Sequence, residues 1–143
     1  MPNQTPFVFR RGLLLGGGLI LLIGLGHVLM PTHGYDPAVT AGWSEAAREH
    51  FYYLATYIIC GFLLTLGGLS ILFAGTPPSP ATAMFATVMA ALWSLRLVLE
   101  FLYPVRVGIY GIEKPHVLLA ATLVVVVASY LAAAFSAWRR LTG

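Results

Sequence analysis

Arg96 and Glu100 are two charged residues within an otherwise apolar stretch, "WSLRLVLEFLYP" (residues 93–104). Residues four apart lie on one face of an α-helix, so these side chains are able to form an ion pair. A charge at mid-bilayer costs about 2.5–3.5 kcal/mol, and such residues therefore face protein or water. Trp93 and Tyr103 continue the same helical stripe. We expect this stripe to face a bundle interior, with Glu100 near enough to the surface to be solvated and Arg96 one turn deeper.

Histidines add further polar residues to the group formed by Arg96 and Glu100. His27 lies at the end of the first apolar segment, His50 and His116 precede the second and fourth, and His33 lies in a connection. One interpretation is structural, with the ion pair self-neutralised and the histidines interfacial. The other is a binding site, because ionisable residues inside a membrane are functional candidates. The predicted site comprises His27, His50, Arg96, Glu100, Trp93, Tyr53 and Tyr57.

Three ligand classes are compatible with this site. A histidine pair on neighbouring helices is the usual axial ligation of haem b, which here would use His27 and His50. Imidazole and carboxylate also suit a metal, although no histidines stand three or four residues apart. A quinone or lipid headgroup would use Arg96 as donor, with Tyr53, Tyr57 and Trp93 as walls. No nucleophile-and-base arrangement or phosphate-binding loop accompanies them.

The elements that position these residues are predicted from apolar length. Of 143 residues, 59% are hydrophobic and only 9% charged, whereas a soluble domain is about a quarter charged. Crossing the hydrocarbon layer takes roughly 20 apolar residues in a helix. Four segments satisfy this: 12–30, 51–74, 81–103 and 117–138. We therefore predict an all-α integral membrane four-helix bundle, with residues 1–143 forming a single transmembrane domain.

Arginines predict how the chain is oriented. Arg10 and Arg11 precede the first span, and Arg139 and Arg140 follow the fourth, with no acidic residue near either pair. Positive charge marks cytoplasmic flanks, so we expect both termini in the cytoplasm of an inner (plasma) membrane protein and the polar group in the outer leaflet. No basic run exceeds two residues, which argues against nucleic-acid binding.

Small residues predict the helix packing. Glycines at 12, 16–18, 24 and 26 in the first span, and at 61, 67 and 68 in the second, allow close helix approach. The single cysteine, Cys60, excludes an intramolecular disulfide and is expected to be a small core residue. Ser44 is expected to cap a helix that continues into the second span.

Residues 10–37, "RRGLLLGGGLILLIGLGHVLMPTHGYDP", place an arginine-led first helix before a Gly-His-x-x-x-Pro turn. This resembles the start of the DoxX-like small membrane proteins. The resemblance implies a four-helix bundle and, for some members, a role as a small subunit of a quinone-linked redox complex. With almost no chain outside the spans, we expect an accessory subunit of a larger redox or photosynthetic membrane complex, with other membrane subunits and the lipid bilayer as partners. The alternative is a stand-alone bundle that acts on a lipophilic quinone, lipid or haem.

Overall fold

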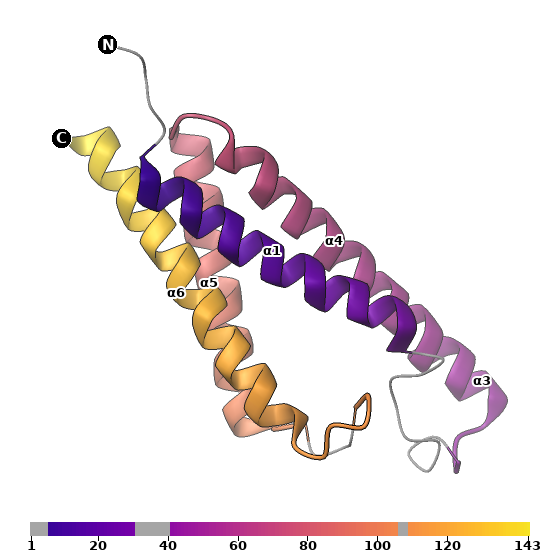
Figure 1. Cartoon of the computed structure of the whole chain (residues 1–143). Coiled ribbons are helices and arrows are strands. Elements are labelled where there is room, and N and C mark those ends of the chain that lie inside the picture. The colour runs from indigo at the N-terminus through magenta and orange to yellow at the C-terminus, as the bar shows by residue number, and fades with distance from the viewer. Residues whose placement is uncertain (1–5, 31–40, 106–108) are drawn as a thin grey trace.

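The computed structural model of the chain describes residues 6–30, 41–105 and 109–143, the side chains of residues 51 and 52 excepted. Its helices are α1 (Phe7–Leu29), α3 (Glu45–Ala47), the π-helix η2 (Arg48–Leu54), α4 (Ala55–Ala74), α5 (Pro80–Leu102) and α6 (Pro115–Thr142). Figure 1 shows their arrangement. The described part of the chain is helical apart from its connections and one isolated bridge between Ile109 and Ile112. The all-α prediction is confirmed.

Within the described residues, four helical stretches are long and apolar enough to cross a membrane: Phe7–Leu29, Glu45–Ala74, Pro80–Leu102 and Pro115–Thr142. At several ends the helices extend beyond the apolar segments predicted from the sequence, because the flanking residues are also helical. Ser44 caps the second stretch as expected, with the Ala47 N–H donating to its Oγ at 3.2 Å. Pro80 and Pro115 each occupy the first helical turn, where proline needs no amide partner.

A capping box fixes the short connection between α4 and α5. The Ser79 N–H donates to Thr82 Oγ1 at 2.8 Å, and the Thr82 N–H donates to Ser79 Oγ at 3.3 Å. These bonds satisfy amides that a helix start would otherwise leave open. Phe73 and Phe85 pack edge to face across the turn, with ring centroids 4.9 Å apart. The turn therefore holds α4 and α5 together at this end.

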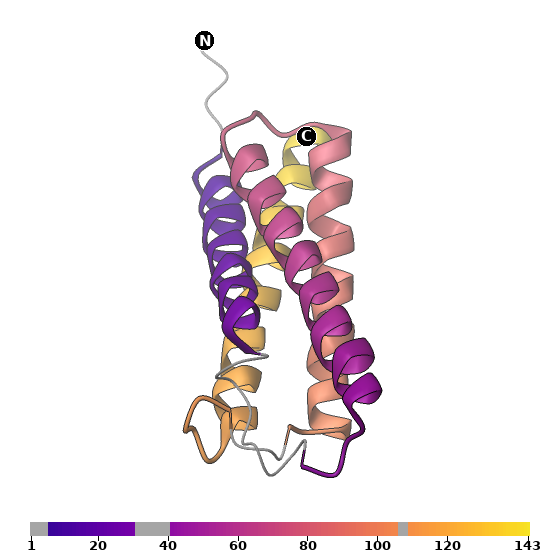
Figure 2. The same cartoon turned by 90° about the vertical axis from the view of Figure 1, so that its right-hand side faces the viewer.

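Helix α1 packs between α4 and α6, and α6 also packs against α5, whereas α4 and α5 scarcely contact each other. In Figure 1 the α1–α4 pair and the α5–α6 pair lie together at one end and diverge toward the other. The closed end holds the start of α1, the end of α6 and residues 75–79, and we call it the arginine end after Arg10, Arg11, Arg139 and Arg140. Figure 2 shows the same four helices from the side, with the turn between α4 and α5 at the arginine end.

Glycines allow the closest approach of α1 to α6. A Cβ on Gly12 would lie 2.5 Å from the backbone oxygen of Ser129, and one on Gly16 would lie 2.8 Å from the Tyr130 ring. Any side chain at these positions would push the helices apart. Gly12 and Gly16 therefore act as the packing residues that the sequence predicts.

A second set of glycines serves the contact between α1 and α4. A Cβ on Gly17 would lie 2.6 Å from the Ser70 side chain, and one on Gly67 would lie 2.8 Å from Leu21. Gly24 also packs closely against α4. The packing prediction is wrong for the other glycines singled out, because a Cβ on each would meet nothing within 4 Å: Gly18, Gly26, Gly61 and Gly68.

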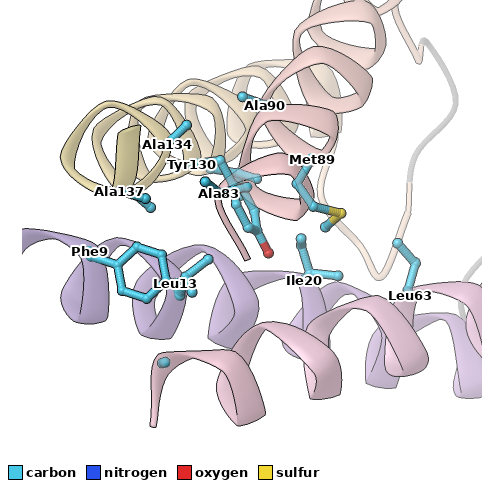
Figure 3. Close-up of a cluster of buried hydrophobic side chains, with 14 residues drawn as sticks. Phe9, Leu13, Ile20, Leu63, Ala83, Met89, Ala90, Tyr130, Ala134 and Ala137 are labelled. Carbon is cyan, nitrogen blue, oxygen red and sulfur yellow. The ribbon is translucent and has the colours of Figure 1, made fainter. Parts of the chain in front are cut away.

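The core lies where the two helix pairs meet, and Figure 3 shows its side chains. Phe9, Leu13 and Ile20 from α1 and Tyr130 from α6 are fully buried there. Tyr130 also forms a hydrogen bond across the core, with its hydroxyl 2.6 Å from Ser70 Oγ on α4. Ser70 Oγ lies 2.8 Å from the Leu66 carbonyl and donates to it. The serine thus has its proton engaged, so the tyrosine hydroxyl is the donor between the two.

Cys60 is buried in the α1–α4 contact, 6% exposed, which agrees with its predicted role as a small core residue. Its thiol donates a weak hydrogen bond to the Gly24 carbonyl at 3.4 Å. This contact lies nearer the diverging end of the bundle, where the site described next is found.

Candidate functional site

A cavity of about 670 Å³ occupies the diverging end, between the two helix pairs. All four long helices contribute to its wall, and so do residues after α5. Most of the lining is apolar, and it comprises Ile23, Gly26, His27, Met30, Ile59, Leu63, Trp93, Arg96, Val105, Ile109, Tyr110, Ile112, Pro115, Leu118, Leu119, Thr122 and Leu123. We call this the cavity end of the bundle. Cavities of roughly 300–1,000 Å³ with apolar walls and few polar groups are typical of small-molecule sites.

Arg96 and Glu100 form the ion pair that the sequence predicts. Arg96 Nη2 donates to Glu100 Oε2 at 2.7 Å. The exposure of the partners is the reverse of the expectation, because the Glu100 side chain is 1% exposed and that of Arg96 is 38% exposed. Glu100 is not solvated. The chain bends at Tyr103 and brings the Val105 N–H to the carboxylate, whereas Arg96 lines the cavity.

Glu100 also anchors the chain that follows α5. Its Oε1 accepts a hydrogen bond from the Val105 N–H at 3.1 Å. Because both carboxylate oxygens are used, one side chain fixes the Arg96 guanidinium and the backbone of Val105 together. Both of these residues line the cavity. Glu100 therefore positions the site without forming part of its wall.

Residues 109–112 form a tight turn against the cavity. Ile109 and Ile112 exchange backbone hydrogen bonds of 2.9 and 3.3 Å. Tyr110 and Gly111 between them have φ of 52° and 74°, the positive values of a type I′ turn. Such a conformation is uncommon for a bulky residue. The Tyr110 hydroxyl donates to the Gly26 carbonyl on α1, and this contact ties the turn to the bundle.

His27 contributes an imidazole to the cavity from the last turn of α1. Its Nδ1 lies 2.8 Å from the Ile23 carbonyl in the same helix. A carbonyl only accepts hydrogen bonds, so Nδ1 must carry the proton and donate. In the neutral ring, Nε2 is then an acceptor.

The structure brings together only part of the predicted site. His27, Trp93 and Arg96 line the cavity, and Glu100 contacts it through Arg96. His50, Tyr53 and Tyr57 are exposed and do not line it. The Tyr53 and Tyr57 rings lie beside each other, with their centroids 6.4 Å apart.

Several other expected members also lie elsewhere. Tyr103 is 75% exposed, so it does not continue the inward stripe of Trp93 and Arg96. His116 is half-buried outside the cavity, and His33 falls outside the described residues. Among the residues described, no group of three or more His, Cys, Asp or Glu side chains is placed to hold a metal ion. The His27–His50 pair required for haem ligation does not converge on the cavity.

Tyr110 and the first turns of α6 are members of the site that were not predicted from the sequence. The pattern "IYGI" (109–112), a Tyr-Gly pair between β-branched residues, carries a hairpin-turn signal. That pattern predicts the turn. It does not predict that Tyr110 contacts the Gly26 carbonyl, which lies 84 residues away along the chain.

Comparison of the chain with protein families, curated proteins and solved structures gives no match. The site is therefore interpreted from its own geometry.

Proposed function

We propose that this protein is a multi-pass inner-membrane protein that binds a lipophilic molecule in the cavity between its two helix pairs. The observation that carries the proposal is the cavity of about 670 Å³, whose apolar walls contain the Arg96 guanidinium and the His27 imidazole. Apolar walls accommodate a hydrocarbon body, and the few polar groups fix its head. This corresponds to the stand-alone binding role considered from the sequence.

Access from the bilayer is supported by the helix arrangement. Helices α4 and α5 scarcely contact each other, and Ile59 on α4 is 46% exposed although it lines the cavity. A ligand with a long tail therefore has a lateral route between these helices. It would leave its tail among the lipids and its head beside Arg96.

Adjacent isoleucines on α4 provide the test. Ile59 lines the cavity, whereas Ile58 is 50% exposed and does not. We expect the purified wild-type protein in mild detergent to retain a lipophilic molecule detectable by mass spectrometry. Ile59→Trp should reduce the retained amount several-fold by filling the cavity, and Ile58→Trp should not. Equal retention in both variants would overturn the assignment of the cavity as the binding site.

We also propose that both termini lie in the cytoplasm, because of the positive charges at the arginine end. Arg10, Arg11, Arg139 and Arg140 lie together at that end, and positive residues favour the cytoplasmic side. A fluorescent or phosphatase reporter fused after Gly143 reports the side directly. Activity of a phosphatase fusion in the periplasm would refute this orientation.

An accessory role in a larger redox or photosynthetic complex is a second proposal, favoured by the incomplete contact between α4 and α5. A helix of another subunit would border this opening in place of lipid. Native electrophoresis of membranes extracted in mild detergent separates the two cases. Migration as a free monomer would count against the accessory role and leave ligand binding intact.

A further inference from the structure

The chemistry of the ligand head follows from the polar groups that the cavity leaves available. Thr122 has its hydroxyl engaged in its own helix, donating to the Leu118 carbonyl at 2.8 Å. Tyr110 donates its hydroxyl proton to the Gly26 carbonyl. The polar side chains left to recognise a ligand are Arg96 and Trp93 on α5, which can donate hydrogen bonds, and His27 on α1.

Arg96 offers hydrogen-bond donors, and together with Glu100 it forms an ion pair that has no net charge. Its guanidinium has five N–H groups, and its hydrogen bond to Glu100 uses Nη2. No side-chain nitrogen in the described, unexposed residues is both sealed from solvent and unbonded. The remaining Arg96 nitrogens are therefore not sealed without a partner, and Arg96 lines the cavity. Because Glu100 neutralises the guanidinium, an anionic head would compete with a carboxylate that is already bound at 2.7 Å.

An anion would also lack another cation to compensate it. Among the described residues that line the cavity, Arg96 is the only charged one. Transferring an uncompensated charge from water to apolar surroundings costs far more than transferring a carbonyl oxygen, whose smaller cost one hydrogen bond offsets. The Arg96 side of the cavity thus favours an uncharged acceptor.

His27 favours a donor. With Nδ1 donating to the Ile23 carbonyl at 2.8 Å, the neutral ring presents the Nε2 lone pair. A ligand hydroxyl is an uncharged group that would donate to it. The two helix pairs therefore present complementary groups: a hydrogen-bond donor on α5 and a hydrogen-bond acceptor on α1.

We propose that the cavity binds an uncharged hydroxy-ester lipid of the diacylglycerol class. Its hydroxyl donates to His27 Nε2, and an ester carbonyl accepts from the Arg96 guanidinium. The acyl chains occupy the apolar wall and leave between α4 and α5. This inference rests on the proposed function and specifies the head of its ligand.

Four lipids with matched chains test the head directly. They are dioleoylglycerol, its acetate ester, which lacks the hydroxyl, the dioleyl diether, which lacks the ester carbonyls, and dioleoylphosphatidic acid, which carries a phosphate. Native mass spectrometry of the full-length protein in detergent measures the binding of each. We expect dioleoylglycerol to bind most tightly and the acetate and the diether each to bind about 3–10-fold more weakly, the effect of one hydrogen bond. A decyl quinone and its quinol serve as a further comparison.

Two variants connect each preference to a residue. His27→Leu should abolish the discrimination between the hydroxyl and the acetate, and His116→Leu, which replaces a half-buried histidine outside the cavity, should retain it. Arg96→Lys keeps a cation beside Glu100 and should reduce the discrimination between ester and ether. The four-lipid comparison on the wild-type protein remains decisive if a variant does not fold.

The outcomes separate this inference from the proposed function. If no lipophilic probe binds the wild-type protein, both fail. If lipids bind but phosphatidic acid, the acetate, the diether or the quinone pair binds as tightly as dioleoylglycerol, then the head assignment is wrong and the cavity assignment stands.

Discussion

Replacing Arg96 with methionine removes the ionic partner of a carboxylate that has almost no contact with solvent. The Glu100 side chain is 1% exposed and lies 2.7 Å from Arg96. In Arg96→Met its remaining hydrogen bond is the one from the Val105 N–H at 3.1 Å. Removing one partner of a buried pair costs about 3–5 kcal/mol, because an uncompensated charge remains buried. We expect Arg96→Met to be strongly destabilised.

Glu100→Gln is expected to be the milder change. The amide oxygen still accepts from Val105, and the Arg96 cation that loses its partner is 38% exposed. The charged hydrogen bond from Arg96 is lost, which costs about 1.5–3 kcal/mol and is less than leaving a carboxylate buried without its partner. Glutamine is the informative substitution, because leucine would leave the Val105 N–H unsatisfied. The double variant contains no buried charge and should regain about 2–3 kcal/mol relative to Arg96→Met.

Thermal unfolding followed by tryptophan fluorescence, at one fixed detergent concentration, measures this order. At about 2–4 °C per kcal/mol, Arg96→Met should lower Tm by roughly 6–20 °C, and the double variant should recover much of that loss. If Glu100→Gln is the more destabilised single variant, or if Arg96→Met unfolds like the wild type, the burial argument is refuted. The double variant should nevertheless bind the lipophilic ligand about 3–10-fold more weakly, because Arg96 supplies one hydrogen-bond donor. A double variant that keeps both its stability and its full affinity for the ligand would show that the pair is scaffolding.

Three further predictions concern the packing of the bundle. Tyr130→Phe should lower stability by about 1 kcal/mol, measured in the same unfolding assay, because it removes the 2.6 Å hydrogen bond to Ser70. Gly12→Ala should cost about 1–3 kcal/mol, since its Cβ would lie 2.5 Å from a backbone oxygen of α6. Gly18→Ala, where a Cβ meets nothing within 4 Å, should be neutral or slightly stabilising; equal losses for the two alanine variants would contradict the close approach of α1 and α6. Cys60, being 6% exposed, should react with a maleimide in the folded protein far more slowly than after denaturation in SDS, and rapid labelling of the native protein would contradict its burial.

Local patterns in the sequence were sufficient to predict the helices and one ion pair. Apolar length predicted four helices able to span a membrane, because hydrocarbon thickness determines how many residues are needed. The Ser44 cap and the Arg96–Glu100 pair were also predicted correctly. Each depends on residues three or four apart in one helix, whose relative positions are fixed by the helix itself.

Contacts between distant segments were decided only by the tertiary structure. Glu100 and not Arg96 is buried, and Glu100 also accepts a hydrogen bond from Val105, beyond the end of α5. The helical spacing of the two residues does not determine which of them is buried. Similarly, Gly12 contacts α6 while Gly18 meets nothing, although both are glycines of one helix. These differences depend on which face of α1 meets a neighbouring helix.

The cavity is likewise a property of the assembled bundle. It exists because the α1–α4 and α5–α6 pairs diverge from the arginine end, and a helix axis direction is not encoded in any single span. Its wall combines Arg96 from α5 with His27 from α1 and Tyr110 from the connection before α6. The sequence determined which polar groups were available near this end of the helices. Packing of small residues at the opposite end set the angle between the pairs, and that angle decided which of those groups share one cavity.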